Sequence, residues 1–441
     1  MFLLLFAGLF IYKLLSYYQQ NKLYSHYVFH NLIEQYRSKI TDGYTDKTSY
    51  RQDELQKVFL NPRKKGHQTI KLYSVTGELI DSVNANLSYQ RRGPNPSENG
   101  FGYQLSFTYK VPNLKSGMYL WEKVVPFIVR KKAPITVVYP TNTINAYDIM
   151  GGKSLYRIFT KQTHLISFHR PTFPAVSFHT SAMMSWLNKQ NQYNINYITD
   201  QDLENNAVLE GCKLLIIIGH SEYWTRKART NFDSFVNKGG DALILSGNTM
   251  WWQVRYTNDL TKLICYKNPS DPINNPELKT INWVNEELNY PVIASIGADF
   301  QNGGFGRKSE KNMGGFKILA PNSPLFKNTH LKKGDILHIS TKEYDGTILK
   351  NDNEHLSLDL NKLGFYKGEL LGFDYAAGDY GTGNGAFLIF QKNKTSGIII
   401  NAGTTDWCSN NGIGGSDSTK IQIITKNMIE GLLSGENLFD K

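Results

Sequence analysis

The clearest hydrophobic pattern along the chain is an aliphatic run at residues 214–218, five apolar residues with no polar residue among them. Such a run predicts a strand buried on both faces, as in a parallel sheet covered by helices. Apolar residues then recur at helical spacing over residues 225–238, and Gly239-Gly240 ends that segment before a second apolar strand at residues 242–245. The pattern predicts a strand–helix–strand unit, and its first loop lies where open α/β sheets place their sites.

Strand-like and helix-like patterns also alternate outside that unit. A strand is expected at residues 135–139, a helix near residues 180–190 and a further strand at residues 193–198. This alternation predicts a doubly wound parallel sheet, an α/β fold. The chain ends in an expected helix at residues 419–433, and we assign residues 133–441 to one α/β domain.

Residues 66–132 carry a different pattern, with short strand-like runs, turn residues between them and no helical period. Strands at this spacing predict a small antiparallel β-sandwich with a scaffolding or binding role. The composition changes near residues 132–134, so a domain boundary is expected there. Residues 21–65 are polar, with several Tyr and Gln residues, and are assigned to a linker.

The first eighteen residues are mostly apolar and carry a single charge, Lys13. This length is near the lower limit for a helix that spans a bilayer, and Tyr12, Tyr17 and Tyr18 are placed as interfacial residues. A cleaved signal peptide is the alternative, although no basic segment precedes the apolar core and no small-residue cleavage site follows it. We interpret residues 1–20 as a single-pass transmembrane anchor of a membrane protein and leave the side of its soluble body undetermined.

The composition describes a globular protein and excludes several classes. Of 441 residues, 40% are hydrophobic and 13% are aromatic, which supports a large core and excludes a disordered chain. The net charge is +11, but the densest basic clusters, residues 63–65 and 130–132, are too short for a nucleic-acid track, so no nucleic-acid partner is expected. Cys212, Cys265 and Cys408 form neither a disulfide framework nor a zinc pattern.

The loop after the first buried strand carries a dense group of chemically active side chains. Residues 219–224 read Gly-His-Ser-Glu-Tyr-Trp, which favours a functional site over a capped sheet edge. Three further polar segments follow or flank strands, at residues 247–255, 343–346 and 401–407, so they could converge with this loop at one sheet edge. The alternative for each segment alone is a surface turn rich in Asn and Gly.

Two glycine-rich segments do not indicate nucleotide binding. Residues 151–154 read Gly-Gly-Lys-Ser, but Tyr147 occupies the position where a phosphate-binding loop needs its first glycine. Residues 381–385 alternate glycine with polar residues and are interpreted as a flexible loop between strands. The sequence has no Gly-x-Ser-x-Gly elbow, so a serine nucleophile has little support.

Several short motifs follow one another along the chain. They are Ser-Gly-Met-Tyr (116–119), Pro-Phe-Ile-Val-Arg (126–130), Gly-Lys-Ser-Leu-Tyr (152–156), Ser-Phe-His-Arg-Pro (167–171), Gly-His-Ser-Glu-Tyr-Trp (219–224), the segment from Gly239-Gly240 to Gln253-Val254-Arg255, and Asn-Ala-Gly-Thr (401–404). In this order they resemble the C-terminal domain of the N,N-dimethylformamidase large (beta) subunit, over roughly residues 66–441. The resemblance implies a glutamine-amidotransferase-like (flavodoxin-like) α/β fold behind a β-rich module.

The resemblance also implies a chemistry. The dimethylformamidase hydrolyses a small tertiary amide with a mononuclear iron that two tyrosines and a glutamate hold. Tyr223 matches one tyrosine ligand, and the second would lie near the Gly247-Asn248 loop, where this chain has Trp251 and Trp252. An indole has no lone pair free for a metal, so a tyrosine ligand is absent there. The candidates for the glutamate are Glu310 and Glu343.

Two functions follow from these residues. The first is a membrane-anchored hydrolase of an amide bond, in which Glu343 or Glu222 acts as general base on water while His220 and Tyr223 polarise a small-molecule amide or hold a metal. The second is a non-catalytic surface protein that binds a glycan or peptide in the same pocket, because a tryptophan pair offers stacking surfaces. The predicted substrate-binding residues are Asn248, Trp251, Trp252, Arg255 and Asp406.

Overall fold

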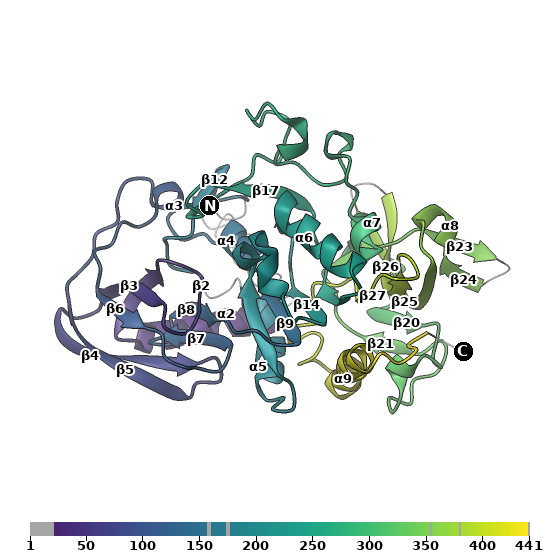
Figure 1. Cartoon of the computed structure of the whole chain (residues 1–441), viewed down its shortest axis with the longest axis horizontal. Coiled ribbons are helices and arrows are strands. Elements are labelled where there is room, and N and C mark those ends of the chain that lie inside the picture. The colour runs from purple at the N-terminus through teal and green to yellow at the C-terminus, as the bar shows by residue number, and fades with distance from the viewer. Residues whose placement is uncertain (1–21, 157–159, 173–176, 353–354, 379–380, 440–441) are drawn as a thin grey trace, which may run out of the picture.

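The architecture is seen in a computed structural model that describes residues 22–156, 160–172, 177–352, 355–378 and 381–439. In Figure 1 a β-rich N-terminal part lies on one side, parallel strands lie in the middle, and the antiparallel strands of the C-terminal half lie on the other side. The longer helices are α2 (Lys22–Arg37), α4 (Thr141–Tyr147), α5 (Phe178–Asn188), α6 (Arg226–Asn237) and α9 (Ser418–Ser434).

Two sheets form the N-terminal part and share one hydrophobic core. Their strand orders are β1-β3-β6 and β2-β8-β7-β4-β5. The strands are β1 (Ile40–Thr45), β2 (Ser49–Tyr50), β3 (Leu55–Pro62), β4 (Gly66–Ser74), β5 (Leu79–Leu87), β6 (Phe107–Lys110), β7 (Gly117–Trp121) and β8 (Val125–Val129). Trp121 is fully buried in this core, and its indole N–H donates to Oε1 of Gln56 at 2.8 Å, so the one polar atom of the ring is paired.

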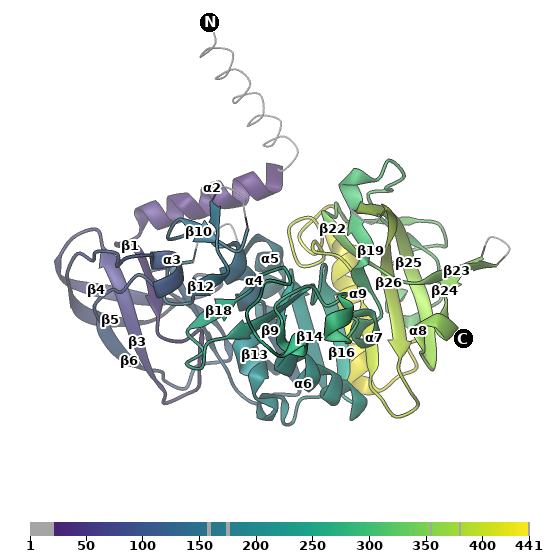
Figure 2. The same ribbon diagram turned by 90° about the horizontal axis from the view of Figure 1, so that it is seen from above.

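The centre of the molecule is an eleven-stranded mixed sheet, with the order β13-β9-β14-β16-β27-β26-β25-β19-β22 and with β20 and β21 attached beside β25. The parallel strands are β13 (Ile195–Thr199), β9 (Ile135–Tyr139), β14 (Leu214–Gly219), β16 (Asp241–Ser246) and β27 (Ile398–Asn401). The antiparallel strands are β26 (Gly381–Gln391), β25 (Lys367–Gly378), β19 (Asp299–Phe305), β22 (Glu343–Gly346), β20 (Gly315–Ile318) and β21 (Ile336–His338). Figure 2 shows the parallel strands between the N-terminal sheets and the hairpin of β25 and β26.

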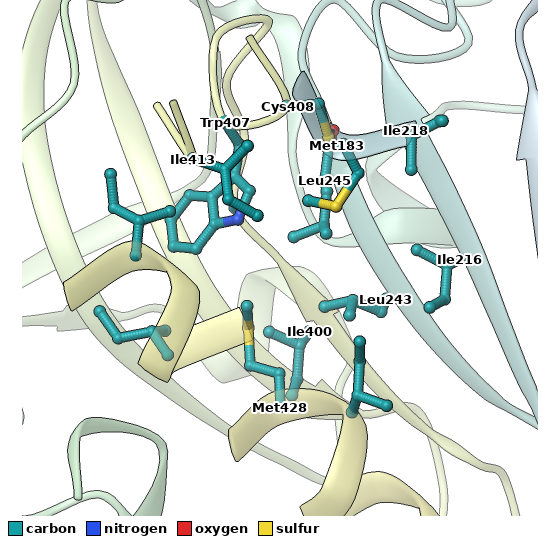
Figure 3. Packing of buried hydrophobic residues seen from close by; sticks show 14 of the residues in the cluster. Met183, Ile216, Ile218, Leu243, Leu245, Ile400, Trp407, Cys408, Ile413 and Met428 are labelled. Atoms are coloured by element: carbon teal, nitrogen blue, oxygen red, sulfur yellow. Dashed lines mark hydrogen bonds between the residues drawn. The ribbon is translucent and has the colours of Figure 1, made fainter. Parts of the chain in front are cut away.

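Helices cover both faces of the parallel strands. Successive residues of β14 point to opposite faces of the sheet. Ile216 belongs to one core with Met183 of α5 and Met428 of α9, as Figure 3 shows. Ile217 belongs to the core on the other face, with Phe232 of α6. Burial on both faces explains why the sequence of this strand contains no polar residue.

The predicted doubly wound, glutamine-amidotransferase-like sheet is wrong. Among the described residues more lie in strands than in helices, the strands form several sheets, and the parallel strands are only one part of the largest sheet. The hairpin of β25 and β26 joins β27 in antiparallel register and ends the alternation of strand and helix. Residues 381–385, expected to be a flexible loop, begin strand β26. Strand β26 needs glycine at position 385, because a Cβ there would lie 2.5 Å from the ring of Tyr344.

A smaller four-stranded sheet, with the order β12-β18-β17-β15, carries residues of the candidate site. Its strands are β12 (Leu165–Ser167), β18 (Lys262–Ile264), β17 (Trp252–Tyr256) and β15 (Tyr223–Thr225). Further short elements are α3 (Pro96–Asn99), β10 (Lys153–Ser154), β11 (Lys161–Gln162), η2 (Asp200–Glu204), η3 (Asn206–Leu209), η4 (Pro276–Leu278), η5 (Glu286–Leu288), α7 (Ile293–Ile296), η6 (Gly306–Lys308), η7 (Pro324–Phe326), β23 (Leu349–Asp352), β24 (His355–Leu358) and α8 (Leu360–Leu363).

The prediction of a membrane protein held by a transmembrane helix is corrected by the structure. Among the residues that the structure describes, every helix is too short or too polar to cross a membrane. Residues 1–20, to which the sequence assigns the anchor, lie outside the described ranges. The anchor and the membrane location that depends on it are therefore unsupported.

Candidate active site

The chain turns sharply at the carboxyl end of β14. Gly219 has a φ of +80°, and a Cβ there would lie 2.6 Å from Cγ2 of Thr180, so glycine alone fits this close approach to α5. After the turn, the backbone N–H of Glu222 donates to Oγ1 of Thr143 in α4 at 2.8 Å. The turn and this hydrogen bond place His220 and Glu222 beside α4.

Glu222 is fully buried, and three side chains surround its carboxylate. Tyr147 donates its hydroxyl to Oε2 at 2.8 Å, and Tyr156 donates its hydroxyl to Oε1. Nε2 of His220 lies 3.3 Å from Oε2. Each carboxylate oxygen thus accepts from one phenol, which offsets part of the cost of burying this group.

A second buried carboxylate faces the same imidazole. Oε2 of Glu343, the first residue of β22, lies 3.4 Å from Nε2 of His220. The same oxygen accepts a hydrogen bond from Nδ2 of Asn248 at 3.1 Å. Asn248 holds a left-handed backbone, with φ of +50°, in the loop that follows β16. The ends of β14 and β16 and the start of β22 therefore meet around one imidazole.

The two carboxyls differ in proton affinity. Burial raises the pKa of Glu222 to about 7, although the ammonium of Lys267 opposes this shift. Burial also acts to raise the pKa of Glu343, but the positive charge that His220 carries when protonated and the ammonium of Lys342 outweigh it and hold that pKa below its usual value. Burial lowers the pKa of His220 to about 4, so its ring is neutral at neutral pH. Acid–base catalysis uses pairs of carboxyls whose pKa values are separated in this way.

An aromatic stack with a lysine at one end lies beside these carboxyls. The rings of Tyr147 and Tyr156 stack with centroids 4.2 Å apart, and Nζ of Lys267 lies 3.3 Å from the centroid of Tyr156. The rings of Tyr223 and Trp252 have centroids 5.2 and 5.0 Å from the same Nζ. Burial and the nearby carboxylate raise the pKa of both stacked tyrosines well above its usual value. Burial lowers the pKa of Lys267 to about 8, which leaves it mostly protonated at neutral pH.

Part of the set predicted from the sequence meets in this site. The residues that meet are His220, Glu222, Asn248 and Glu343. Tyr223 lies next to the stack, where it packs in a cluster with Val254 and Leu263. Its buried hydroxyl has no hydrogen-bond partner among the described residues, and its role as a metal ligand stays a prediction.

Two other predicted residues have structural partners. Arg255 forms a bidentate ion pair with Asp271, with N–O distances of 2.7 and 2.9 Å. Asp406 is buried and accepts the backbone N–H of Lys342 at 2.8 Å. Arg255 therefore stabilises the loop that contains Asp271, while Asp406 fixes the backbone just before Glu343.

The tryptophan pair does not form the exposed platform that a surface-binding role requires. Trp251 is 7% exposed, and its ring packs edge-on against Phe300. Trp252 is half-buried beside Lys267. Glu310, the other candidate for a glutamate ligand, is exposed at the surface. The structure thus favours Glu343 over Glu310 as a site residue.

The sequence does not predict the positions of Tyr147, Tyr156 and Lys267. Tyr147 stands out in the sequence only where a phosphate loop would need glycine, and Tyr156 only as the last residue of a family motif. That motif is the one signal that could have drawn attention to the stack. Lys267 follows β18 with no motif around it, so its place beside the site is a purely tertiary feature.

The iron implied by the resemblance needs two tyrosine oxygens and one glutamate oxygen. Tyr147, Tyr156 and Glu222 bring such a donor set together without a tyrosine at position 251, so these residues fit the metal. Within the described ranges, no group of three or more His, Cys, Asp and Glu side chains could hold a metal ion. The fit therefore rests on the two phenol oxygens.

Two buried carboxyls near the site, Asp345 and Asp200, predict a pH-dependent stability. Burial raises the pKa of both to about 7, from a usual value of 3.8. The folded state holds these protons more tightly than the unfolded chain does, so their stabilising contribution is complete below about pH 4 and is lost as the pH rises through about 7. The free energy of unfolding is expected to fall between about pH 5 and pH 8 by on the order of 2 kcal/mol for each carboxyl, and the melting temperature falls with it.

Thermal denaturation followed by circular dichroism across this pH range is the measurement. Asp345→Asn is expected to make the profile shallower, because the amide does not titrate while Asp200 still does. Asp53→Asn, at an exposed position, is the control and is expected to keep the slope of the parent chain. A melting temperature that rises across the range would contradict the prediction.

The chain is similar to known proteins at the level of one family. A family model described as N,N-dimethylformamidase beta subunit-like, C-terminal, matches residues 94–412, which is most of the chain. None of the curated proteins matches the chain in sequence.

Several solved structures are similar at low identity. A β-galactosidase from Bacillus circulans sp. alkalophilus is 12% identical over 69% of this chain and 32% of its own, with a TM-score of 0.34. A β-galactosidase from the Antarctic haloarchaeon Halorubrum lacusprofundi is 8% identical over 68% of this chain and 31% of its own, with a TM-score of 0.30. A ThuA-like protein from Bacteroides uniformis is 12% identical over 70% of this chain and 95% of its own, with a TM-score of 0.31. The chain spans about a third of the length of the β-galactosidases that it matches.

Proposed function

The chain belongs to the N,N-dimethylformamidase beta subunit-like family, and we propose that it hydrolyses the carbon–nitrogen bond of a small amide. One observation carries this proposal. The buried carboxyls of Glu222 and Glu343 lie 3.3 and 3.4 Å from Nε2 of His220, with pKa values displaced in opposite directions. A carboxylate that stays ionised beside a neutral imidazole is suited to move a proton between water and a leaving amine.

Glu343 is the proposed general base. Its lowered pKa keeps it ionised at neutral pH, and the hydrogen bond from Asn248 fixes its orientation. A water molecule next to this carboxylate gives its proton to Glu343 while the water oxygen attacks the carbonyl carbon of the amide. The same carboxyl then passes the proton to the nitrogen, the C–N bond breaks, and a carboxylic acid and an amine leave. Such proton transfer contributes about two to four orders of magnitude in rate.

Nε2 of His220 and Oδ1 of Asn248 make no well-directed hydrogen bond to the described residues, although Nε2 lies 3.3 and 3.4 Å from oxygens of Glu222 and Glu343. A buried acceptor left unpaired costs about 1–3 kcal/mol, so a molecule that donates to Oδ1 of Asn248 is favoured. In its Nε2–H tautomer, His220 can donate to the carbonyl oxygen of an amide. Where the amide nitrogen carries a hydrogen, Oδ1 of Asn248 can accept it.

Tyr147, Tyr156 and Glu222 are the proposed holders of a ferric ion. Bound there, the ion would polarise the carbonyl of the amide as a Lewis acid. The two phenols would give up the protons that they donate to Glu222, because a cation reverses the effect that the carboxylate has on their pKa. Affinity for iron is therefore expected to fall as the pH is lowered.

Tyr156→Phe is expected to abolish the visible charge-transfer band of the iron-loaded protein and to lower its iron content by at least about tenfold, since phenyl supplies no oxygen. Tyr223→Phe is the matched control, because Tyr223 is also buried beside Lys267 but does not donate to Glu222. Visible absorption, elemental analysis and amine release from N,N-dimethylformamide are measured on both variants. Loss of the band in Tyr223→Phe alone would place the metal at Tyr223 and contradict this assignment.

A further inference from the structure

Lys267 holds a backbone conformation that lysine seldom adopts. Its φ is +62°, in the left-handed region, and its backbone N–H donates to the carbonyl of Thr280 at 2.8 Å. Strained backbone of this kind persists only where the surrounding structure enforces it, and it clusters at functional sites. This conformation accompanies a side chain whose ammonium lies against the tyrosine stack.

The ammonium lies two ring layers away from the imidazole of the site. The ring of Tyr147 has its centroid 5.4 Å from that of His220 and stacks on Tyr156 at 4.2 Å. Nζ of Lys267 lies 3.3 Å from the centroid of Tyr156, and because Tyr147 already covers one face of that ring, the ammonium occupies the other face. A molecule that reaches both His220 and Lys267 must therefore span the thickness of this stack.

Lys267 has no ion pair and no side-chain hydrogen bond among the described residues; its described contacts are ring faces. Lys392 shows the usual arrangement for a lysine with little exposure, an ion pair with Asp233 at 2.6 Å. Glu222 is near enough to act on this half-buried ammonium electrostatically, but no described carboxylate lies within ion-pair distance of it, so a ligand that supplies an acceptor would add a direct partner. The ring faces attract the cation but accept no strong hydrogen bond.

We propose that Lys267 binds a carboxylate on the substrate, so that this chain acts on an anionic amide of the kind formed by an N-acylated amino acid. The inference rests on the proposed function. The amide lies at His220 and Glu343, and the carboxylate lies at Lys267, a few bonds farther along the substrate. The net charge of +11 favours approach of an anion to the chain.

Kinetics with a pair of isosteric formamides test the proposal. The probes are 4-formamidobutanoate, which carries the carboxylate, and 4-formamidobutanamide, which is neutral; formate release is measured for both. The parent chain is expected to show a kcat/KM about 10- to 100-fold higher for the anion, as expected for one charge-assisted hydrogen bond. Lys267→Met is expected to remove this preference through KM with little change in kcat, whereas Lys267→Arg keeps the charge and most of the preference.

Lys123→Met is the matched control. Lys123 also has a left-handed backbone, with φ of +61°, and its ammonium lies 5.2 Å from the ring of Tyr73 in the N-terminal sheets. This variant removes the same charge and a contact between an ammonium and a ring, together with an ion pair to Glu34 at 3.8 Å, and it is expected to keep the preference for the anion. Equal melting temperatures of the lysine variants show that the comparison concerns folded protein.

The possible outcomes distinguish failure of the carboxylate site from failure of the proposed amidase function. If both formamides are hydrolysed equally, or if Lys267→Met keeps the preference, the carboxylate site is wrong while the amidase function stands. If neither formamide releases formate, the proposed function fails for these amides. Binding of 4-formamidobutanoate is then measured by calorimetry, which tests the anion site without hydrolysis. Binding to the parent chain that Lys267→Met loses would support the site, and no binding to the parent chain would overturn it.

Discussion

Glu343→Gln is expected to lower kcat for amide hydrolysis by about two to four orders of magnitude while the fold stays intact. Glutamine has nearly the same shape, and its carbonyl oxygen can still accept the hydrogen bond that Asn248 gives to Glu343. The amide cannot take a proton from water, however, so the attacking water loses its base. The rate is measured by amine release, and circular dichroism verifies the fold.

Glu310→Gln is the control for that experiment. Glu310 is exposed at the surface, so its substitution removes the same charge without touching the site and is expected to leave the rate unchanged. If Glu343→Gln lowers the rate by less than about tenfold, the loss is too small for removal of a general base. Proton transfer would then belong to another group.

Glu222→Gln is expected to remove bound iron and to lower the hydrolysis rate by about four orders of magnitude. The carboxylate accepts one hydroxyl from Tyr147 and one from Tyr156, and glutamine replaces one of its acceptor oxygens with a donor. One tyrosine hydroxyl is left unpaired in a buried place, which costs about 1–3 kcal/mol of stability. The variant is therefore expected to be colourless, nearly inactive and slightly less stable.

Three measurements check the Glu222→Gln prediction: iron per chain, visible absorption and amine release. Loss of activity with normal iron content would show that Glu222 acts on the proton rather than on the metal. Normal iron content together with a rate within about tenfold of the parent would remove Glu222 from the site altogether.

The local hydrophobic pattern was sufficient to predict several helices and strands of the fold. The predicted strand at residues 214–218, helix at 225–238 and strand at 242–245 correspond to β14, α6 and β16. The terminal helix expected at residues 419–433 corresponds to α9. These segments have strong periodicity because each is buried on a defined face, so their sequence records their secondary structure.

The sheet as a whole could not be predicted, because its order depends on contacts between distant segments. β16 pairs with β27, which follows it by about one hundred and fifty residues, and β27 pairs in turn with β26. The start of β26 is rich in glycine, because a Cβ at Gly383 would meet the carbonyl oxygen of Gly303 and a Cβ at Gly385 would meet the ring of Tyr344, so it has no apolar alternation. Composition therefore favoured a loop where the structure has a strand.

The carboxylates of the site were easier to find from the sequence than the tyrosines. His220 and Glu222 directly follow a buried strand, so their position at the sheet edge follows from the pattern. Tyr223 is adjacent to Glu222 in the sequence, but Tyr147 and Tyr156 are the tyrosines that donate to the Glu222 carboxylate. That choice depends on how α4, which ends at Tyr147, and the segment after β10, which carries Tyr156, pack beside the loop that follows β14. No local pattern records this packing.

The most direct test of the central claim is the rate of amine release from N,N-dimethylformamide as ferric iron is added to the metal-free parent chain. If Tyr147, Tyr156 and Glu222 hold one ion beside Glu343, the rate rises with added iron and levels off near about one equivalent per chain. A chain that releases no amine at any iron content, or one whose rate does not depend on iron, would contradict the claim.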